Sequence, residues 1–200
     1  MEQLTVPPAS LQAAATSSAP ARVEAPARVR APARVRASEL AVLSLPMHDA
    51  RVRPLLDELA QEYDSRYGNL FGRGAAAEEL NRYPAEEFVA PGGALLIVQE
   101  NGESVAGGAF RRHGPDTAEF KRIWTHSAHR RRGLARFVLA ELEALAARRG
   151  YNRVYLTTGP RQPEAKHLYL NSGYEPLFDL AADPETIKFL AFSKDLEPRG

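Results

Sequence analysis

The stretch EFKRIWTHSAHRRRGLA, from Glu119 to Ala135, decides the fold of this chain. Its first part is typical of a β-strand, and the glycine-containing turn that follows opens a helix. A helix N-terminus exposes N–H groups that have no intrahelical partner and carries about half a positive charge, so it favours an anion. Arginines surround this turn, although cations are unfavourable at a helix N-terminus unless an anion binds there. We therefore predict a phosphate-binding turn.

The spacing within this turn resembles a known signature. Arg130, Gly133 and Ala135 fit R-x-x-G-x-A, which resembles the Q/R-x-x-G-x-G/A turn of the GNAT family of acyl-CoA N-acetyltransferases. Downstream, QPEAKHLYLNSGYEPL, from Gln162 to Leu177, resembles the second conserved helix of that family. Upstream, Glu119 lies 11 positions before Arg130, the offset at which many members carry a catalytic carboxylate. One departure is Gln162, because the family often has Asn at this position.

The hydrophobic pattern predicts a single α/β (α+β) domain over residues 39–200. Asn101-Gly102 between two apolar runs is a strong hairpin signal, so the first half is an antiparallel meander. A helix that ends at Gly150 connects the Glu119 strand to the next strand, which makes these two strands parallel. The order matches a GNAT-like mixed, mostly antiparallel sheet with one central parallel β-α-β crossover flanked by helices. Strands are predicted at 40–44, 94–100, 104–112, 119–125, 154–157 and 188–193, and helices at 52–63, 75–82, 134–150 and 163–173, with a break at 68–74.

Residues 1–38 differ in composition from the rest of the chain. Ala and Pro supply 16 of them, none is aromatic, and APARV recurs three times with a period of six. Such a segment buries too little apolar surface to offset an ordering cost of about 1–2 kcal/mol per residue. We predict a disordered tail. A transit peptide is the alternative that this composition leaves open.

The overall composition of the chain excludes several classes of protein function. The formal charge is +1, with 26 basic and 25 acidic side chains, so we expect neither specific nucleic-acid binding nor membrane binding. No cysteine is present to act as a thiolate nucleophile. No apolar run approaches the roughly 18 residues of a membrane-spanning helix, and we expect a cytoplasmic protein. His126 and His129 lack a third obvious ligand, so we expect no metal.

The resemblance implies an N-acetyltransferase that transfers an acetyl group from acetyl-CoA to a primary amine by direct attack in a ternary complex. The expected acceptor is a small, amino-acid-like molecule, and a homodimer is left open. Alternatives are a protein (lysine or N-terminal) acetyltransferase and a non-catalytic acyl-CoA-binding regulatory domain. In the family, acetyl-CoA lies in the wedge between the two parallel strands. The resemblance therefore implies cofactor binding by Ile123, Trp124, Thr125, Arg130, Arg131, Arg132, Gly133, Leu134, Ala135, Arg136, Gln162 and Ala165.

Two side chains are the expected catalytic residues. Tyr169 would donate a hydrogen bond to the departing sulfur; a phenol, of pKa about 10, is a weaker acid than a thiol of about 8.5, so full proton transfer is disfavoured. Glu119 would accept the amine proton, directly or through a water. The alternatives are that Tyr169 is an ordinary core aromatic and that Glu119 only pairs with Lys121 or Arg122.

Acceptor recognition is expected in two regions, Tyr63–Arg82 and Asp179–Thr186. Within the first region, Arg66, Arg73 and Arg82 are candidates to bind a carboxylate, because a guanidinium can form a two-pronged hydrogen bond with it.

Overall fold

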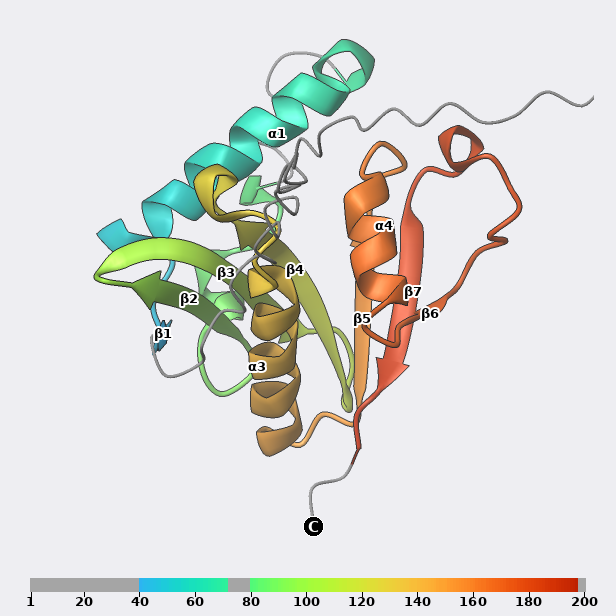
Figure 1. Cartoon of the computed structure of the whole chain (residues 1–200). Coiled ribbons are helices and arrows are strands. Elements are labelled where there is room, and N and C mark those ends of the chain that lie inside the picture. Colours follow the sequence, from blue (N-terminus) through green and yellow to red (C-terminus); the bar gives the residue numbers. More distant parts are fainter. Residues whose placement is uncertain (1–39, 72–79, 198–200) are drawn as a thin grey trace, which may run out of the picture. The chain divides into compact units, whose positions relative to one another are not determined.

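A computed structural model describes residues 40–71 and 80–197 of the chain. The predicted tail and most of the predicted helix 75–82 lie outside these residues. Seven strands form one sheet in the order β1-β2-β3-β4-β5-β7-β6, as Figure 1 shows. The strands are β1 (Leu40–Ser44), β2 (Ala94–Glu100), β3 (Glu103–Arg112), β4 (Thr117–Thr125), β5 (Arg153–Thr158), β6 (Glu175–Pro176) and β7 (Leu190–Asp195), and the helices are α1 (Arg53–Phe71), α3 (Leu134–Arg148) and α4 (Pro163–Leu170).

The pairing of the strands confirms the predicted fold class. Every pair is antiparallel except β4 and β5, which α3 connects by the predicted crossover. The hairpin between β2 and β3 turns at Asn101 and Gly102, whose φ angles of 53° and 83° suit a type I′ turn. Gly150, with φ 88°, follows the end of α3 as predicted.

The parallel strands pair over only part of their length. Their register runs from Thr117 opposite Arg153 to Phe120 opposite Leu156. Beyond this point β5 stays with β7 as far as Thr158, whereas β4 stays with β3 as far as Thr125. Figure 1 shows the two strands diverging. The divergence opens a wedge in the sheet, and beyond Phe120 one edge of β4 has no strand partner among the described residues.

A β-bulge lies in β4 beside this wedge. Lys121 pairs with Ala109 and Trp124 with Gly107, so two β4 residues lie opposite Gly108. One of them, Arg122, has φ 57°, in the left-handed region. A bulge breaks the strict alternation of side chains. As a result, Lys121, Arg122 and Trp124 contact the side of the sheet that carries α1, as their partners Tyr83, Phe88 and Glu58 show.

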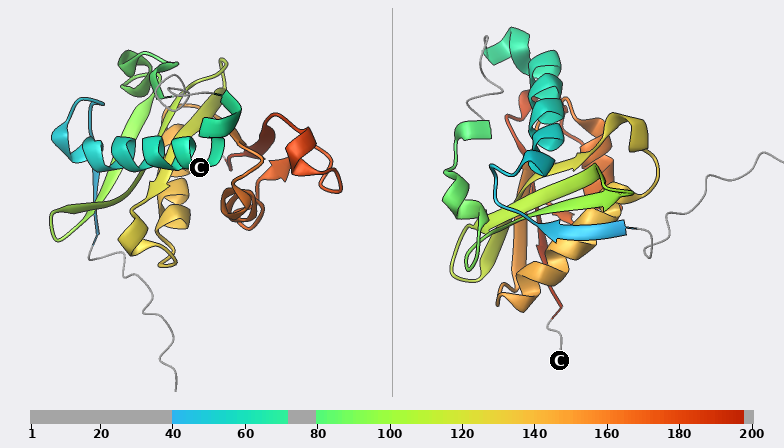
Figure 2. Two further views of the ribbon diagram at one scale, coloured as in Figure 1. Left: turned by 90° about the horizontal axis from the view of Figure 1, so that it is seen from above. Right: turned by 90° about the vertical axis from the view of Figure 1, so that its left-hand side faces the viewer.

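Two apolar clusters hold helices on opposite faces of the sheet (Figure 2). On one face, Val52, Leu55 and Leu59, at the start of α1 and just before it, pack against β2, β3 and Trp124. On the other face, Leu134, Val138 and Leu142 of α3 and Tyr169 of α4 pack against the sheet. The helical spacing of these apolar residues explains why each helix buries one face.

Several predicted bounds were wrong, and one strand was missed. α1 does not break at Gly68 but continues to Phe71. Contacts of Arg66 and Tyr67 with Arg161 hold this end of α1, which outweighs the cost of about 1 kcal/mol that glycine imposes in a helix. The last strand begins at Leu190 rather than at Lys188. The two-residue strand β6, which pairs with β7, was not predicted.

Candidate active site

A cavity of about 980 Å³ lies where β4 and β5 diverge. It is lined by the end of β4, the start of α3 and the start of α4 on one side. The rest of the lining comes from side chains of α1, the segment 80–88 and the segment 185–189. Both regions expected to recognise the acceptor therefore contribute to its wall. The predicted site residues that line the cavity are Ile123, Trp124, Thr125, Arg130, Arg131, Gly133, Leu134, Ala135, Arg136, Gln162, Ala165 and Tyr169.

The start of α3 presents backbone donors to this cavity. Gly133 occupies the N-cap position with φ 85°, and no side chain among the described residues caps the helix there. The first N–H groups of a helix have no intrahelical acceptor, and the helix dipole adds a partial positive charge at this end. A Cβ atom at Gly133 would find no described atom within 4 Å, so the backbone is open to the cavity. This arrangement suits an anion.

Thr125, at the end of β4, carries a further unsatisfied group. Its hydroxyl is buried and has no hydrogen-bond partner among the described residues. A buried polar group without a partner costs about 1–3 kcal/mol. Because Thr125 lines the cavity beside the unpaired edge of β4, a ligand with amide groups along its length would find donors and acceptors here.

The arginines of the turn divide into two groups. Arg131 and Arg136 are exposed at the cavity, and Arg130 forms an ion pair with Glu62 at 3.2 Å. Arg132 instead binds Glu100 at 2.6 Å and is not among the lining residues. The hydrogen bond from Arg132 lowers the pKa of Glu100. Arg132 therefore anchors the turn to the end of β2.

Tyr169 lines the cavity from α4, and Tyr63 of α1 is one of its neighbours. The ring of Tyr169 is buried against Tyr174 and Phe192, at centroid distances of 5.8 and 5.4 Å. Burial, and to a lesser extent the neighbouring Tyr63, raises the pKa of Tyr169 well above that of a free phenol. The hydroxyl therefore keeps its proton at any physiological pH and can serve as a hydrogen-bond donor.

Glu119 is buried and ion-paired. One carboxylate oxygen lies 2.9 Å from Arg111 Nε, and the other lies 3.2 Å from Lys121 Nζ. Glu119 is not among the residues that line the cavity. Glu119 thus forms the ion pair with Lys121 that was one of the alternatives considered from the sequence. The role of Glu119 as a base stays a prediction.

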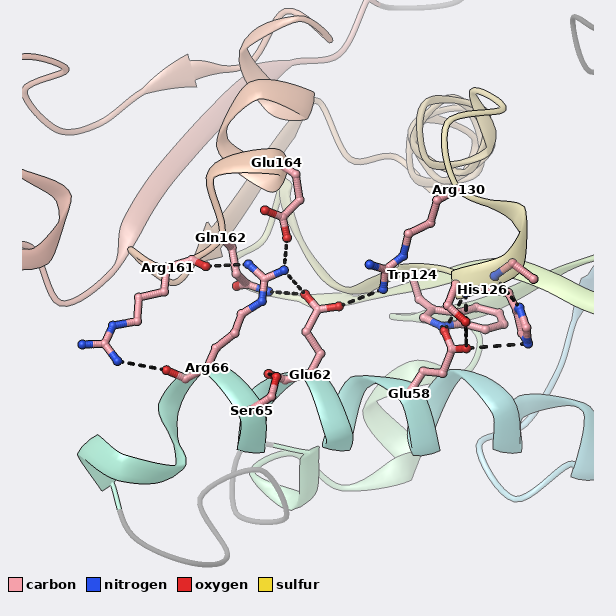
Figure 3. A network of polar contacts seen from close by, with 12 residues as sticks. Glu58, Glu62, Ser65, Arg66, Trp124, His126, Arg130, Arg161, Gln162 and Glu164 are labelled. Atoms are coloured by element: carbon pink, nitrogen blue, oxygen red, sulfur yellow. Dashed lines mark hydrogen bonds and ion pairs between the residues drawn. The ribbon is translucent and has the colours of Figure 1, made fainter. Parts of the chain in front are cut away.

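A polar network, here called the clasp, joins the second half of α1 to the start of α4 (Figure 3). Arg66 binds Glu164, the carbonyl of Arg161 and, at 3.4 Å, Glu62. Gln162 donates to Glu62 at 3.2 Å and accepts from Thr158 at 2.8 Å. Arg66 is therefore engaged within the protein rather than directed at a ligand. Arg73 lies outside the described residues, and Arg82 is an exposed residue that lines the cavity.

Glu58 fixes the predicted phosphate-binding turn to α1, a contact that was not predicted from the sequence. Its carboxylate accepts from the indole of Trp124 at 2.9 Å, from the hydroxyl of Ser127 at 2.8 Å and from the Ser127 amide at 3.0 Å. Burial opposes the charged form, but the hydrogen bonds from Ser127 and Trp124 outweigh it and lower the pKa of Glu58. Figure 3 shows Glu58 reaching from α1 toward Trp124 and His126.

The described residues contain no group of three or more potential metal ligands. The rings of His126 and His129 pack edge to face within the turn, with their centroids 5.5 Å apart. No helix in the described part of the chain is long and apolar enough to cross a membrane.

Comparisons with known proteins agree with this geometry. The chain is 34% identical over 92 residues to the uncharacterized N-acetyltransferase YsnE of Bacillus subtilis, a match that covers 43% of this chain and 61% of that protein. The fold is similar to PaiA N-acetyltransferase from Thermoplasma acidophilum, solved with coenzyme A (TM-score 0.60, 11% identity, 78% of this chain and 98% of that one). It is also similar to a GNAT family acetyltransferase from Elizabethkingia anophelis with acetyl-CoA bound (TM-score 0.56, 14% identity, 79% and 99%).

The fold is that of the N-acetyltransferase structures to which the chain is similar. Residues 56–174 match the acetyltransferase (GNAT) family. Since this range covers more than half of the sequence, the chain belongs to the GNAT family.

Proposed function

We propose that this protein transfers an acetyl group from acetyl-CoA to the primary amine of a small molecule by direct attack in a ternary complex. The observation that carries the proposal is a cavity whose lining includes the start of α3 with its arginines, side chains from α1 and two loops, and Tyr169 of α4. One half of this lining presents backbone donors and arginines, and the other presents side chains from α1 and two loops. Two proteins of the same fold were solved with coenzyme A or acetyl-CoA, which supports the choice of co-substrate.

The chain has groups suited to each part of acetyl-CoA, which supplies the thioester. The open edge of β4 at Ile123–Thr125 and the Thr125 hydroxyl would bind the amides of the pantetheine arm. The N–H groups around Gly133, with Arg130 and Arg131, would bind the pyrophosphate. Gln162 already bonds to Thr158 and Glu62, so in this role its contribution is to shape the wall.

Tyr169 would act at the reacting centre. When the amine nitrogen attacks the carbonyl carbon, the carbon–sulfur bond breaks and negative charge develops on the sulfur. A preorganised donor aimed at developing charge contributes about 10²–10³ in rate. Because its pKa is raised, Tyr169 suits hydrogen bonding to the sulfur rather than full proton transfer.

The proton must leave the attacking amine, since an alkylamine of pKa about 10.4 is only about 0.1% neutral near pH 7.4. Glu119 does not line the cavity and is held by Arg111 and Lys121. We therefore assign this step to a water in the cavity that passes the proton on to bulk solvent.

The form of the second half favours a small acceptor over a protein. Its lining comes from Leu59 and Tyr63 of α1, the segment 80–88 and the segment 185–189, and the clasp ties α1 to α4. A protein lysine would have to enter between these elements. A small amine needs only to fill the cavity.

An assay of CoA release tests the proposal. Purified protein, acetyl-CoA and a panel of small amines, diamines, lysine-containing peptides and N-terminal peptides should give amine-dependent CoA release, fastest with small amines. Mass spectrometry should find one acetyl group on the amine. Faster reaction with peptides would favour the protein acetyltransferase alternative. Binding of acetyl-CoA without turnover of any amine would favour the regulatory alternative.

A further inference from the structure

The charges that line the cavity are unevenly distributed. Among the described residues, seven basic and three acidic ones contribute to its wall. All three carboxylates have arginine partners: Glu62 lies 3.2 Å from Arg130, Glu164 binds Arg66, and Glu185 lies 3.1 Å from Arg161. An acceptor with a second positive charge would therefore compete with an arginine for every lining carboxylate that the structure describes.

Three of these basic residues, Lys121, Arg122 and Arg82, belong to a part of the lining that we call the acceptor wall. Because of the bulge in β4, Lys121 and Arg122 contact the α1 side of the sheet rather than the α3 side. The remaining members of the wall are apolar or aromatic, namely Leu59, Tyr63, Leu80, Tyr83, Phe88 and Trp124. The wall thus combines positive charge with an apolar surface.

Of the two cations on β4, Lys121 is better placed than Arg122 to bind a ligand. The Arg122 guanidinium bonds to the carbonyl of Leu80, lies 3.4 Å from the sulfur of Met47 and stacks 4.3 Å from the centre of the Phe88 ring. Its donors are therefore directed at the protein. Lys121 lines the cavity with its side chain 13% exposed, and an ammonium group has three donors that can serve more than one acceptor.

Glu119 and Tyr83 hold Lys121 in place. The Tyr83 ring lies between two cations, with Arg111 at 4.0 Å and Lys121 at 5.2 Å from its centre. Glu119 bridges the same two cations, and Arg111 also binds Glu87 at 2.7 Å. A buried carboxylate shared in this way restrains a flexible lysine, whose side chain otherwise loses about 2 kcal/mol of rotamer entropy when it is ordered.

We propose that the acceptor is an amine that also carries an anionic group and an apolar body, that Lys121 binds the anionic group, and that Glu119 is a positioning residue for Lys121. This inference rests on the proposed acetyl transfer and specifies its substrate class. A carboxylate and a phosphonate share the required chemistry, so the test includes both.

Matched acids and amides test the wild-type protein. L-alanine, L-leucine and L-phenylalanine would each be compared with the corresponding amide, with the aminophosphonic acid analogue of phenylalanine and with 1,5-diaminopentane. The amine of an amide is less basic than that of the acid, so chemistry alone favours the amide. We expect kcat/KM to favour an acid or the phosphonate by about tenfold or more, an energy difference of about 1.4 kcal/mol. The preference should shrink as salt screens the charge.

Substitution of Lys121 tests the assignment of the residue. Lys121→Met keeps most of the stem and removes the charge, so the ratio of acid to amide should fall toward one, chiefly through a higher KM for the acid. Lys121→Arg should keep a preference for the acid. Lys166→Met is the matched control, because Lys166 packs over Phe178 and does not line the cavity. Thermal melting of each variant shows whether it is folded.

Glu119→Gln separates positioning from base catalysis. A positioning role predicts a higher KM for the acid and a pH–rate profile of kcat that parallels wild type. A base predicts a large loss of kcat near pH 7 that recovers in part as the pH approaches about 9.5, where more of the amine is neutral.

Each outcome bears on a separate claim. CoA release only with amides, diamines or peptides would overturn the anionic acceptor while leaving acetyl transfer intact. A Lys121→Met protein that retains the acid preference would remove Lys121 from the site. Should Lys121→Met not fold, the wild-type ratio and its salt dependence decide the question. Absence of CoA release with every amine would overturn acetyl transfer itself, and the inference with it.

Discussion

The two halves of the cavity are built in different ways. The half assigned to acetyl-CoA consists largely of backbone: the open edge of β4, the uncapped start of α3 and the glycine between them. The acceptor wall consists of side chains that come from α1, the segment 80–88 and the bulged part of β4. Backbone groups stay the same when side chains are exchanged. The comparison therefore implies that acceptor preference can change by substitution while cofactor binding stays constant.

The sharpest test of this division concerns Tyr169, which lines the cavity from α4. Tyr169→Phe keeps the ring and its packing but removes one donor. We expect kcat to fall by about 10²–10³ while acetyl-CoA affinity and the acceptor KM stay close to wild type, and the free energy of unfolding to change by less than about 1 kcal/mol.

The matched control is Tyr174→Phe, which removes a hydroxyl bonded to Glu143 at 2.8 Å and outside the cavity. It should lower stability by about 1 kcal/mol and leave kcat within about twofold. The pH dependence gives an independent check. Because the pKa of Tyr169 is raised, its phenol stays protonated through pH 10, so wild-type kcat should show no descending limb near the ordinary phenol pKa of about 10. A descending limb there that Tyr169→Phe abolishes would show that Tyr169 titrates like an ordinary phenol, and would contradict the raised pKa while keeping its hydroxyl in the reaction.

The next test changes the backbone half. Gly133→Val puts a β-branched side chain on a residue with φ 85° at the start of α3. We expect acetyl-CoA affinity to fall by about 10- to 100-fold in calorimetry, since the side chain covers the exposed N–H groups and the left-handed conformation costs about 1–2 kcal/mol.

Gly102→Val is the matched control, because it introduces the same backbone strain at a position outside the cavity. Gly102 has φ 83°, its Cβ would also meet no described atom within 4 Å, and it lies in the hairpin turn. The Gly102→Val variant should be destabilised about as much as Gly133→Val, and its affinity for acetyl-CoA should be unchanged. Equal affinity of the two variants would remove the α3 start from the cofactor half.

The smallest effect is expected outside both halves. If the predicted tail takes no part in chemistry, a protein that starts near Arg36 should keep kcat/KM within about twofold of the full-length chain for its best amine. A loss of about tenfold would assign the tail a role in substrate binding or catalysis, and would show that the cavity is not the whole site.

The sequence predicted the backbone half much better than the side-chain half. Strand β2 was predicted at its observed bounds, and the Asn101-Gly102 turn and the crossover were confirmed. Each depends on local rules: turn residues that accept positive φ, hydrophobic periodicity and the handed crossover. The arginine turn belongs to the same group, because its glycine and the following helix are adjacent in the chain.

The side-chain half depends on contacts between distant residues. Glu62 and Arg66 have the spacing of a helical ion pair, but their bonds to Gln162 and Glu164 cross about half of the chain. The bulge at Arg122 leaves no mark that separates Lys121 from an ordinary alternating strand residue. Periodicity alone therefore places Glu119 and Lys121 on one face but cannot show that they share a buried ion pair.

The open edge of β4 has a consequence for measurement. Past Phe120, one side of this strand has no neighbouring strand in the described part of the chain, so amides that point to that side exchange hydrogen with solvent unless something else binds them. Hydrogen–deuterium exchange within Lys121–Thr125 would thus act as a built-in reporter of occupancy. It would follow the loading of the wedge directly, without a label and without the acceptor.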